Sequence, residues 1–246
     1  MQDSKPRTAV ITCSVLEIEI EHFARGLRHI VGLAKLPQGL HNDPPKLRQD
    51  LQVLIEEVEL EHEPEAIVLG YGLCSRGTEG VSARKARIVI PRAHDCITLL
   101  LGSKERYADY VSKSPGTYWY SPGWNKHHLP PGERRYLTLL RQYQDQYGED
   151  NAQYLMDMEQ NWFHTYDRAT YVDLGVGDTD NDVQLTRECA DWLKWDFDHQ
   201  KGDPDLVKDL LECNWDSERF LILEPGETLR LTADERIMEA APLDEA

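Results

Sequence analysis

Two short apolar runs, Ala66–Leu69 and Ile88–Ile90, constrain the fold of this chain more than any other feature. They are rich in β-branched residues and carry no charge, which is typical of strands buried on both faces of a parallel sheet. Each is followed at once by polar, turn-forming chain with a cysteine, Cys74 after the first run and Cys96 after the second. Ligands of open α/β sheets bind beyond the carboxyl ends of the strands, so both thiols are expected at the functional edge.

The same arrangement occurs near the N-terminus, where Ala9–Thr12 reads as a strand that ends at Cys13. Ser14, with Glu17 three residues later, has the form of a capping box and predicts a helix to about Leu27. A helix N-terminus lowers the pKa of a nearby thiol. The pattern leaves two interpretations of Cys13 open, a reactive thiol or a thiol that packs under the helix.

Recurrence of strand, thiol and helix predicts an α/β fold with three layers, a mostly parallel sheet and Rossmann-like strand–helix units. We expect a single domain over residues 1–246, with a helical cap at about 132–166 and an acidic, frayed tail from Glu239. Further expected elements are a helix after Asp43 to about Glu63, a helix from Cys96 to about Val111, short strands at Tyr118–Tyr120 and Thr170–Leu174, and a terminal hairpin of Phe220–Leu223 with Thr228–Leu231.

The formal net charge of -17 argues against a nucleic-acid partner and against an anionic membrane surface. No apolar run approaches the roughly 20 residues that span a bilayer, and the first residues lack the apolar stretch of a secretory signal. A cytoplasmic protein is expected, in which thiols stay reduced. Five cysteines without a CxxC spacing argue against a disulfide framework and leave thiolate chemistry, metal ligation or burial.

Several polar residues lie near the expected functional edge. We expect His94 and Asp95 to act in catalysis, although Asp95 also reads as a helix N-cap. Arg76 and Arg92 are the nearest cations and are candidates to hold a substrate carboxylate or phosphate, with surface ion pairs as the alternative. The remaining candidates for substrate contact are His41, Tyr71, Gly72 and Thr78. The loop glycines match neither phosphate-loop fingerprint, and Cys189 and Cys213 are expected in the core.

Five motifs together resemble the DUF1638 family of bacterial and archaeal proteins: ITCSVLE, LPQGLHNDP, VLGYGLCSRGTEG, VIPRAHDCITLLLGS and PGTYWYSPGW. The resemblance runs from about Thr8 to Asp182. It implies three recurring cysteine positions, matching Cys13, Cys74 and Cys96, and a tie to corrinoid-dependent methyltransferase systems. Relatives often have ACG where this chain has TCS, and a PHC-type motif where it has His94-Asp95-Cys96, so the histidine is displaced by one residue.

Three thiolates from three strand ends suit a soft or borderline metal. One option is a [4Fe-4S] cluster with one open iron, similar in ligand layout to quinolinate synthase; another is Zn²⁺, with His94 or an exchangeable fourth ligand. The expected function is a metal- or iron-sulfur-dependent enzyme acting on a small molecule, in one-carbon or methyl transfer. The alternatives are a cofactor-independent thiol acid/base enzyme similar to amino-acid racemases, and a non-catalytic accessory protein that binds a small ligand or metal.

Overall fold

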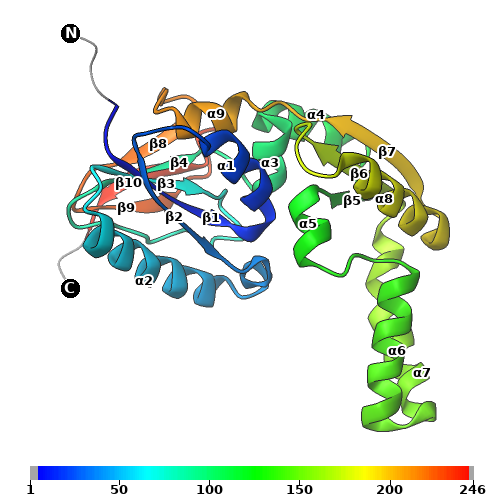
Figure 1. The fold of residues 1–246 in the computed structure, drawn as a ribbon. Helices are drawn as coiled ribbons and strands as arrows, with labels where there is room; N and C mark the ends of the chain where they lie inside the picture. Colours follow the sequence, from blue (N-terminus) through cyan, green and yellow to red (C-terminus); the bar gives the residue numbers. More distant parts are fainter. Residues whose placement is uncertain (1–4, 244–246) are drawn as a thin grey trace. The chain divides into compact units, whose positions relative to one another are not determined.

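The computed structural model describes residues 5–243, which divide into two compact units (Figure 1). Among the described residues, unit 1 comprises 5–107 and 202–243, and unit 2 is the continuous segment 108–201. The expectation of one domain over the whole chain stays a prediction. The elements of unit 1 are β1 (Thr8–Cys13), η1 (Ser14–Leu16), α1 (Glu17–Ala24), β2 (Ile30–Leu36), η2 (Gln38–Asn42), α2 (Pro44–His62), β3 (Ala66–Gly70), β4 (Arg87–Pro91), α3 (Cys96–Leu101), α9 (Asp205–Leu211), β8 (Phe220–Leu223), β9 (Glu227–Leu231) and β10 (Met238–Pro242).

The core of unit 1 is a five-stranded sheet in the order β2-β1-β3-β4-β8. The first four strands are parallel and β8 is antiparallel to β4. Every residue of β1 and β3 is buried, as expected for strands covered on both faces. Figure 1 shows α2 on one face of this sheet and α1 with α9 on the other. The predicted α/β class, with a mostly parallel sheet between helical layers, is confirmed.

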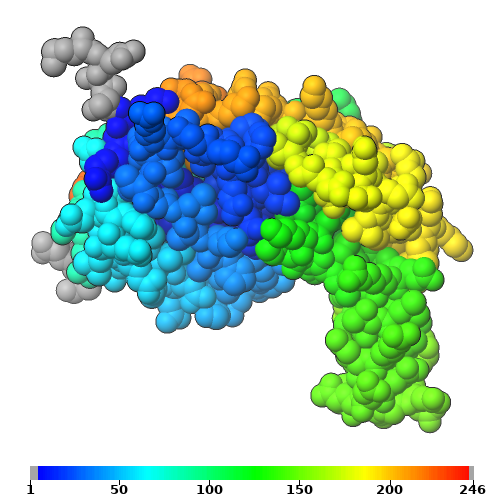
Figure 2. Space-filling view, viewed as in Figure 1, coloured from blue at the N-terminus to red at the C-terminus, as the bar shows by residue number. Residues whose placement is uncertain are grey.

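Helix α2 shows how local sequence builds one of these layers. Asp43 accepts a hydrogen bond from the Lys46 backbone N–H, and prolines occupy the first turn, where their missing N–H groups cost nothing. An apolar stripe that includes Leu47 and Leu51 is buried, while the opposite face forms part of the surface drawn in light blue in Figure 2. Near its end, the buried Glu59 carboxylate accepts backbone N–H groups from residues 84–86 at 2.8–3.0 Å, which fastens the approach to β4.

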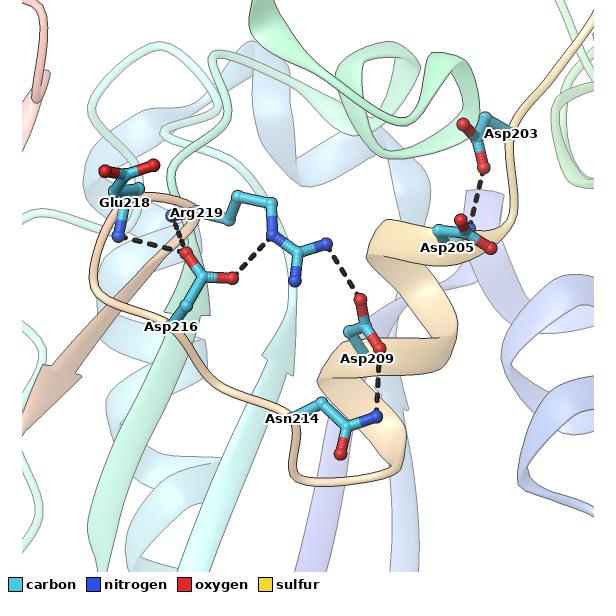
Figure 3. Close-up of polar contacts among 7 residues, drawn as sticks. All are labelled: Asp203, Asp205, Asp209, Asn214, Asp216, Glu218 and Arg219. Atoms are coloured by element: carbon cyan, nitrogen blue, oxygen red, sulfur yellow. Dashed lines mark hydrogen bonds and ion pairs between the residues drawn. The ribbon is translucent and has the colours of Figure 1, made fainter.

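The C-terminal part of unit 1 differs from the expected terminal hairpin. Phe220–Leu223 joins the central sheet beside β4, and β9 pairs with β10. The prediction of a frayed tail from Glu239 is therefore wrong for Glu239–Pro242. Arg219 bridges Asp209 and Asp216 at 2.8 and 2.6 Å, and this ion-pair network ties α9 to the segment before β8 (Figure 3).

Three other local predictions are wrong. The expected helix from Cys96 to about Val111 is split at Gly102, which has φ 89°, a left-handed conformation that glycine adopts without strain. The capping box at Ser14 does not form, because Ser14–Leu16 is a separate 3₁₀ turn and the Ser14 hydroxyl accepts the Gln38 N–H at 2.9 Å. Cys213 follows α9 instead of lying on it and is only half-buried.

Unit 2 is built on its own parallel sheet, in the order β5-β6-β7. Its elements are β5 (Thr117–Tyr120), α5 (Pro122–His127), α6 (Glu133–Tyr147), α7 (Glu149–Gln160), η3 (Asn161–Thr165), β6 (Arg168–Asp173), α8 (Thr179–Leu193) and β7 (Asp196–Lys201), while α4 (Lys104–Lys113) joins the two units in sequence. Cys189 lies on the buried face of α8 and in the core, as predicted, and the helices expected at 132–166 are present.

Candidate functional site

Three of the five cysteines lie at one edge of the unit 1 sheet. Cys13 is the last residue of β1, Cys74 lies in the loop after β3, and Cys96 begins α3, the helix that follows β4. The order β2-β1-β3-β4 places the reversal of strand order between β1 and β3. Ligands of open α/β sheets bind at this switch point, outside the carboxyl ends of the strands. Cys13 and Cys74 therefore flank the position at which this topology favours a ligand.

Backbone hydrogen bonds fasten the loop after β3, which contains Cys74 and is called the Cys74 loop, to the segment between β4 and α3 that leads to Cys96. The Leu73 N–H donates to the Ala93 carbonyl at 2.9 Å, and the Cys74 N–H donates to the His94 carbonyl at 3.1 Å. Gly72 permits this approach, since a Cβ on Gly72 would lie 2.6 Å from the Asp95 nitrogen. Thr78 closes the other end of the loop, where its hydroxyl donates to the Gly72 carbonyl at 3.2 Å. Gly72 and Thr78 thus shape the loop through its backbone.

The Cys74 loop contains a run of left-handed backbone. Cys74, Ser75 and Arg76 have φ values of 46°, 56° and 73°. Residues with a Cβ are strained in this region, and such strain is retained where the surrounding structure enforces it, often at functional sites. A run of three non-glycine residues at one of the thiols marks this loop as unusual.

Burial raises the pKa of all three thiols, and the Cys13 thiol adds to the shift at both Cys74 and Cys96. Burial raises the pKa of Cys13 to about 11, in spite of a backbone hydrogen bond from Val15. Burial, followed by the Cys13 thiol, raises the pKa of Cys74 to about 12. Burial, Asp95 and the other two thiols raise the pKa of Cys96 well above its usual value. The expected lowering of the Cys13 pKa by a helix N-terminus is therefore wrong, because desolvation outweighs it.

Tyr71 lies among these thiols. Its pKa is raised first by burial and then by Cys13, Cys74 and Cys96, so its hydroxyl is close to all three. The residue is 2 % exposed, and its hydroxyl has no hydrogen-bond partner among the residues that the structure describes. A buried polar group without a partner costs about 1–3 kcal/mol and calls for a functional explanation.

The two residues predicted for catalysis are placed differently. Asp95 caps α3, accepting the Thr98 N–H at 3.0 Å and the Thr98 hydroxyl at 3.2 Å, and Tyr107 also hydrogen-bonds to it. Asp95 is nevertheless close enough to Cys74 and Cys96 to raise both of their pKa values. His94 has an exposed side chain and contributes its carbonyl to the loop contact described above.

The predicted substrate-binding cations are engaged elsewhere. Arg76 is exposed and pairs with Glu79 at 2.8 Å, which matches its alternative interpretation as a surface ion pair. Arg92 donates to the carbonyls of Ser217, Arg236 and Met238 and so holds the C-terminal segment. The His41 ring contacts the Gln38 carbonyl at 2.6 Å within η2, the 3₁₀ turn before α2.

The thiols of Cys13, Cys74 and Cys96 are of the type that binds a soft metal, but as they are placed in this structure they do not form a coordination site. Across residues 5–243, no group of three or more His, Cys, Asp or Glu side chains is placed to hold a metal ion. Burial desolvates the three thiols, and they lie near enough to one another to shift their pKa values. Among residues 5–243, no cation is one of the groups that shift these pKa values. A bound cation would supply the missing positive charge and deprotonate the thiols.

Unit 2 carries two features that sequence reasoning missed. A cavity of about 400 Å³ is lined by aromatic residues that include Phe163, Trp192 and Trp195. On the sheet, the buried Asp173 carboxylate contacts His199 Nε2 at 2.5 Å. No local sequence pattern predicts either feature, because the residues that form each feature come from segments far apart in the sequence.

Comparisons with known proteins were made for the whole chain. No curated protein and no solved structure matched it. Among the described helices, none has both the length and the apolar character needed to cross a membrane. A family model described as a protein of unknown function, DUF1638, matches residues 35–211, which include Cys74, Cys96 and most of both units. Because this match covers well over half of the sequence, the chain belongs to the DUF1638 family.

Proposed function

We propose that this protein is a metal-dependent enzyme whose Cys13, Cys74 and Cys96 thiolates hold Zn²⁺ or a [4Fe-4S] cluster. The proposal is supported by the placement of three thiols at the carboxyl-end edge of one sheet, beside the strand-order reversal, where burial raises their pKa values and no cation among residues 5–243 lowers them. Thiols used directly as nucleophiles or bases are activated by nearby positive charge that lowers their pKa. Here the pKa values are raised, so thiolate chemistry at neutral pH needs a bound cation.

The chain's own residues would divide the work as follows. The three thiolates would hold the metal, and the buried Tyr71 hydroxyl, which lies near all three, would be available to donate a hydrogen bond at the same site. Asp95 stays in its cap and orients the first turn of α3, so it is a positioning residue. When bound, the metal supplies a Lewis acid that activates a small-molecule substrate, or a redox centre if it is the cluster.

We further propose a small molecule as substrate and corrinoid-dependent methyl transfer as the setting, with corrinoid methyltransferase components as partners in the cytoplasm. This part rests only on what the resemblance of the sequence motifs implies, because the family model itself is described as a protein of unknown function. Mixing the metal-loaded protein with a methylated corrinoid protein and a thiol tests it. A change in the corrinoid absorption spectrum that requires this protein supports methyl transfer, and an unchanged spectrum removes this setting from the proposal.

The metal is tested by analysis of protein purified without oxygen. Zinc near one equivalent, or iron with acid-labile sulfide, is expected for the wild type. Cys13→Ser, Cys74→Ser and Cys96→Ser should each lose most of it, because two thiolates hold an ion much less well than three. The matched controls Cys189→Ser and Cys213→Ser should retain wild-type metal content. Equal metal content in all five variants would contradict the proposal.

The second candidate is a metal-free enzyme in which Cys74 and Cys96 exchange protons with a substrate carbon. The absence of a preformed ligand group among residues 5–243 favours it. Its two thiols would have to titrate near neutral pH, which their raised pKa values oppose. Wild-type protein that binds neither zinc nor iron, yet exchanges a substrate proton with solvent, would establish this candidate. A metal-free protein without such exchange would leave a non-catalytic ligand-binding role.

A further inference from the structure

We propose that the aromatic cavity of unit 2 binds a small zwitterion that carries a quaternary ammonium group and a carboxylate. The name denotes the cavity of about 400 Å³ whose aromatic lining residues are Phe163, Tyr166, Trp192 and Trp195. A mostly aromatic cavity of this size with a few polar groups is typical of small-molecule sites. The inference goes beyond the proposed function and does not depend on it, because the lining residues all lie in unit 2.

The aromatic cavity lies at the amino ends of β6 and β7, on backbone that is held in place. Asp167 directly precedes β6; its N–H donates to the Gly116 carbonyl at 2.9 Å, and its carbonyl accepts the Asp196 N–H at 2.8 Å. Trp195 directly precedes β7, and its N–H donates to the Ala190 carbonyl at 2.9 Å. The walls are therefore fixed before a ligand arrives, which lowers the entropic cost of binding.

Three of the aromatic rings meet at an angle and form a corner. The ring planes of Phe163 and Trp195 are 89° apart with centroids 6.0 Å apart, and the Tyr166 ring lies 5.8 Å from Trp195 at 48°. Trp192 is 38 % exposed and lines the side of the cavity that meets solvent. Grouped aromatic rings attract quaternary ammonium groups. Such a group suits this corner better than a primary ammonium, because it has no N–H donors that need acceptors.

Two charges of opposite sign line the same cavity. Within residues 5–243, neither the Asp167 carboxylate nor the Lys194 ammonium forms an ion pair, and the neighbouring Arg168 pairs with Asp196 at 3.2 Å. Asp167 favours the ammonium of a ligand, and Lys194 favours a carboxylate. A ligand with both charges uses both residues, whereas a simple cation is repelled by Lys194 and a simple anion by Asp167.

Gln160 supplies a further donor to the lining. Its Nε2 is buried and has no hydrogen-bond partner among the residues that the structure describes, although the side chain as a whole is only half-buried. A buried donor without a partner is costly, so a small turn of this side chain toward a ligand oxygen gains affinity. Gln160 and Lys194 therefore define the carboxylate end of the site, and the aromatic corner with Asp167 defines the ammonium end.

Trimethylglycine is the probe, because it joins a quaternary ammonium directly to a carboxylate. Its binding to the reduced full-length protein is followed by tryptophan fluorescence and by ligand-observed NMR. Three compounds each lack one feature: 3,3-dimethylbutyrate has a neutral carbon in place of the ammonium nitrogen, glycine has no methyl groups, and choline has no carboxylate. Each should bind about two- to thirty-fold more weakly than trimethylglycine, the range expected for one cation–π or charged contact.

Each compound tests a separate part of the proposal. If 3,3-dimethylbutyrate or glycine binds as tightly as trimethylglycine, the aromatic corner does not recognise a quaternary cation and the proposal is overturned. Choline that binds as tightly as trimethylglycine overturns the zwitterion as ligand. Protein that does not bind trimethylglycine overturns the site altogether. Metal content enters none of these measurements, so each of these results leaves the proposed metal site untouched.

Variants assign the two ends of the site. Asp167→Asn and Trp192→Leu should weaken trimethylglycine and choline alike, whereas Lys194→Gln should weaken trimethylglycine and not choline. Asp145→Asn and Tyr154→Leu change exposed residues outside the cavity and should keep affinity within about two-fold of wild type. Circular dichroism verifies the fold, and Trp192→Phe replaces Trp192→Leu if the latter does not fold. Wild-type affinity in Asp167→Asn, or equal weakening of both ligands by Lys194→Gln, overturns the assignment.

Discussion

Loading the thiol cluster with Zn²⁺ should release close to three protons, even at a pH where ordinary thiols are already ionised. Without metal, the pKa of Cys13 is about 11 and that of Cys74 about 12, and that of Cys96 is also well raised. All three are protonated at pH 7. Each thiol loses its proton when it binds Zn²⁺, so the observed binding constant should rise about a thousand-fold per pH unit.

The free-energy cost behind this dependence follows from the pKa values of Cys13 and Cys74. Deprotonating Cys13 and Cys74 at pH 7 costs about 12 kcal/mol together, and the same step at pH 9 costs about 7 kcal/mol, since one pKa unit corresponds to 1.36 kcal/mol. Zinc binding should therefore be weak at neutral pH compared with exposed cysteine sites and should strengthen steeply in alkaline buffer.

Titration calorimetry of the reduced protein in two buffers of different ionisation enthalpy counts the protons. We expect about three per Zn²⁺ at pH 7 and still about three at pH 9. Three unburied thiols of pKa about 8.5 would release fewer than about one in total at pH 9. At a Zn²⁺ concentration high enough to saturate its weakened site, Cys96→Ser, which removes one thiol, should release about one proton fewer than the wild type. A proton number below about one at pH 9 would refute the argument that burial keeps these thiols protonated.

Three further predictions concern stability in urea. Tyr71→Phe removes a buried, unpartnered hydroxyl and should stabilise the metal-free protein by about 1 kcal/mol; a loss of stability would contradict this. Glu59→Ala leaves three backbone N–H groups without their carboxylate and should cost about 3 kcal/mol or more, against less than about 0.5 kcal/mol for the exposed control Glu57→Ala. Burial works against ionised Asp198, but hydrogen bonds, first from Tyr110, outweigh it and lower its pKa. A lowered pKa contributes stability above the unfolded value that is lost as pH falls, so the deficit of Tyr110→Phe should be largest near pH 7 and shrink below about pH 4. A deficit in the stability of Tyr110→Phe that does not change with pH would count against this role of the ionised Asp198 carboxylate.

Features set by neighbouring residues were predictable from the sequence. The uncharged runs at Ala66–Leu69 and Ile88–Ile90 became buried parallel strands, and the helix caps at Asp43 and Asp95 formed as expected. The position of the cysteines at one edge followed, because parallel strands share the direction of their carboxyl ends. Local patterns suffice here since each depends on contacts within a few residues.

Features set by distant partners were not predictable. Phe220–Leu223 reads as a hairpin strand, but its partner is β4, about 130 residues earlier. Arg92 reads as a substrate-binding cation, but its donors meet carbonyls of the C-terminal segment. The sign of the Cys13 pKa shift depends on how deeply tertiary packing buries it, which no local pattern contains. The left-handed run at Cys74 also lacks the glycines that usually signal such backbone.

The pairing of β4 with β8 has a consequence for synthesis of the chain. Unit 2 is one uninterrupted stretch, whereas unit 1 needs residues from both sides of it. At about 5–20 residues per second, β8 leaves the ribosome on the order of ten seconds after β4. Unit 2 has time to fold in that interval, while the nascent β4 edge waits without its antiparallel neighbour. An open strand edge attracts other chains. The aggregation risk of this protein during translation is thus concentrated in the interval before Phe220–Leu223 emerges.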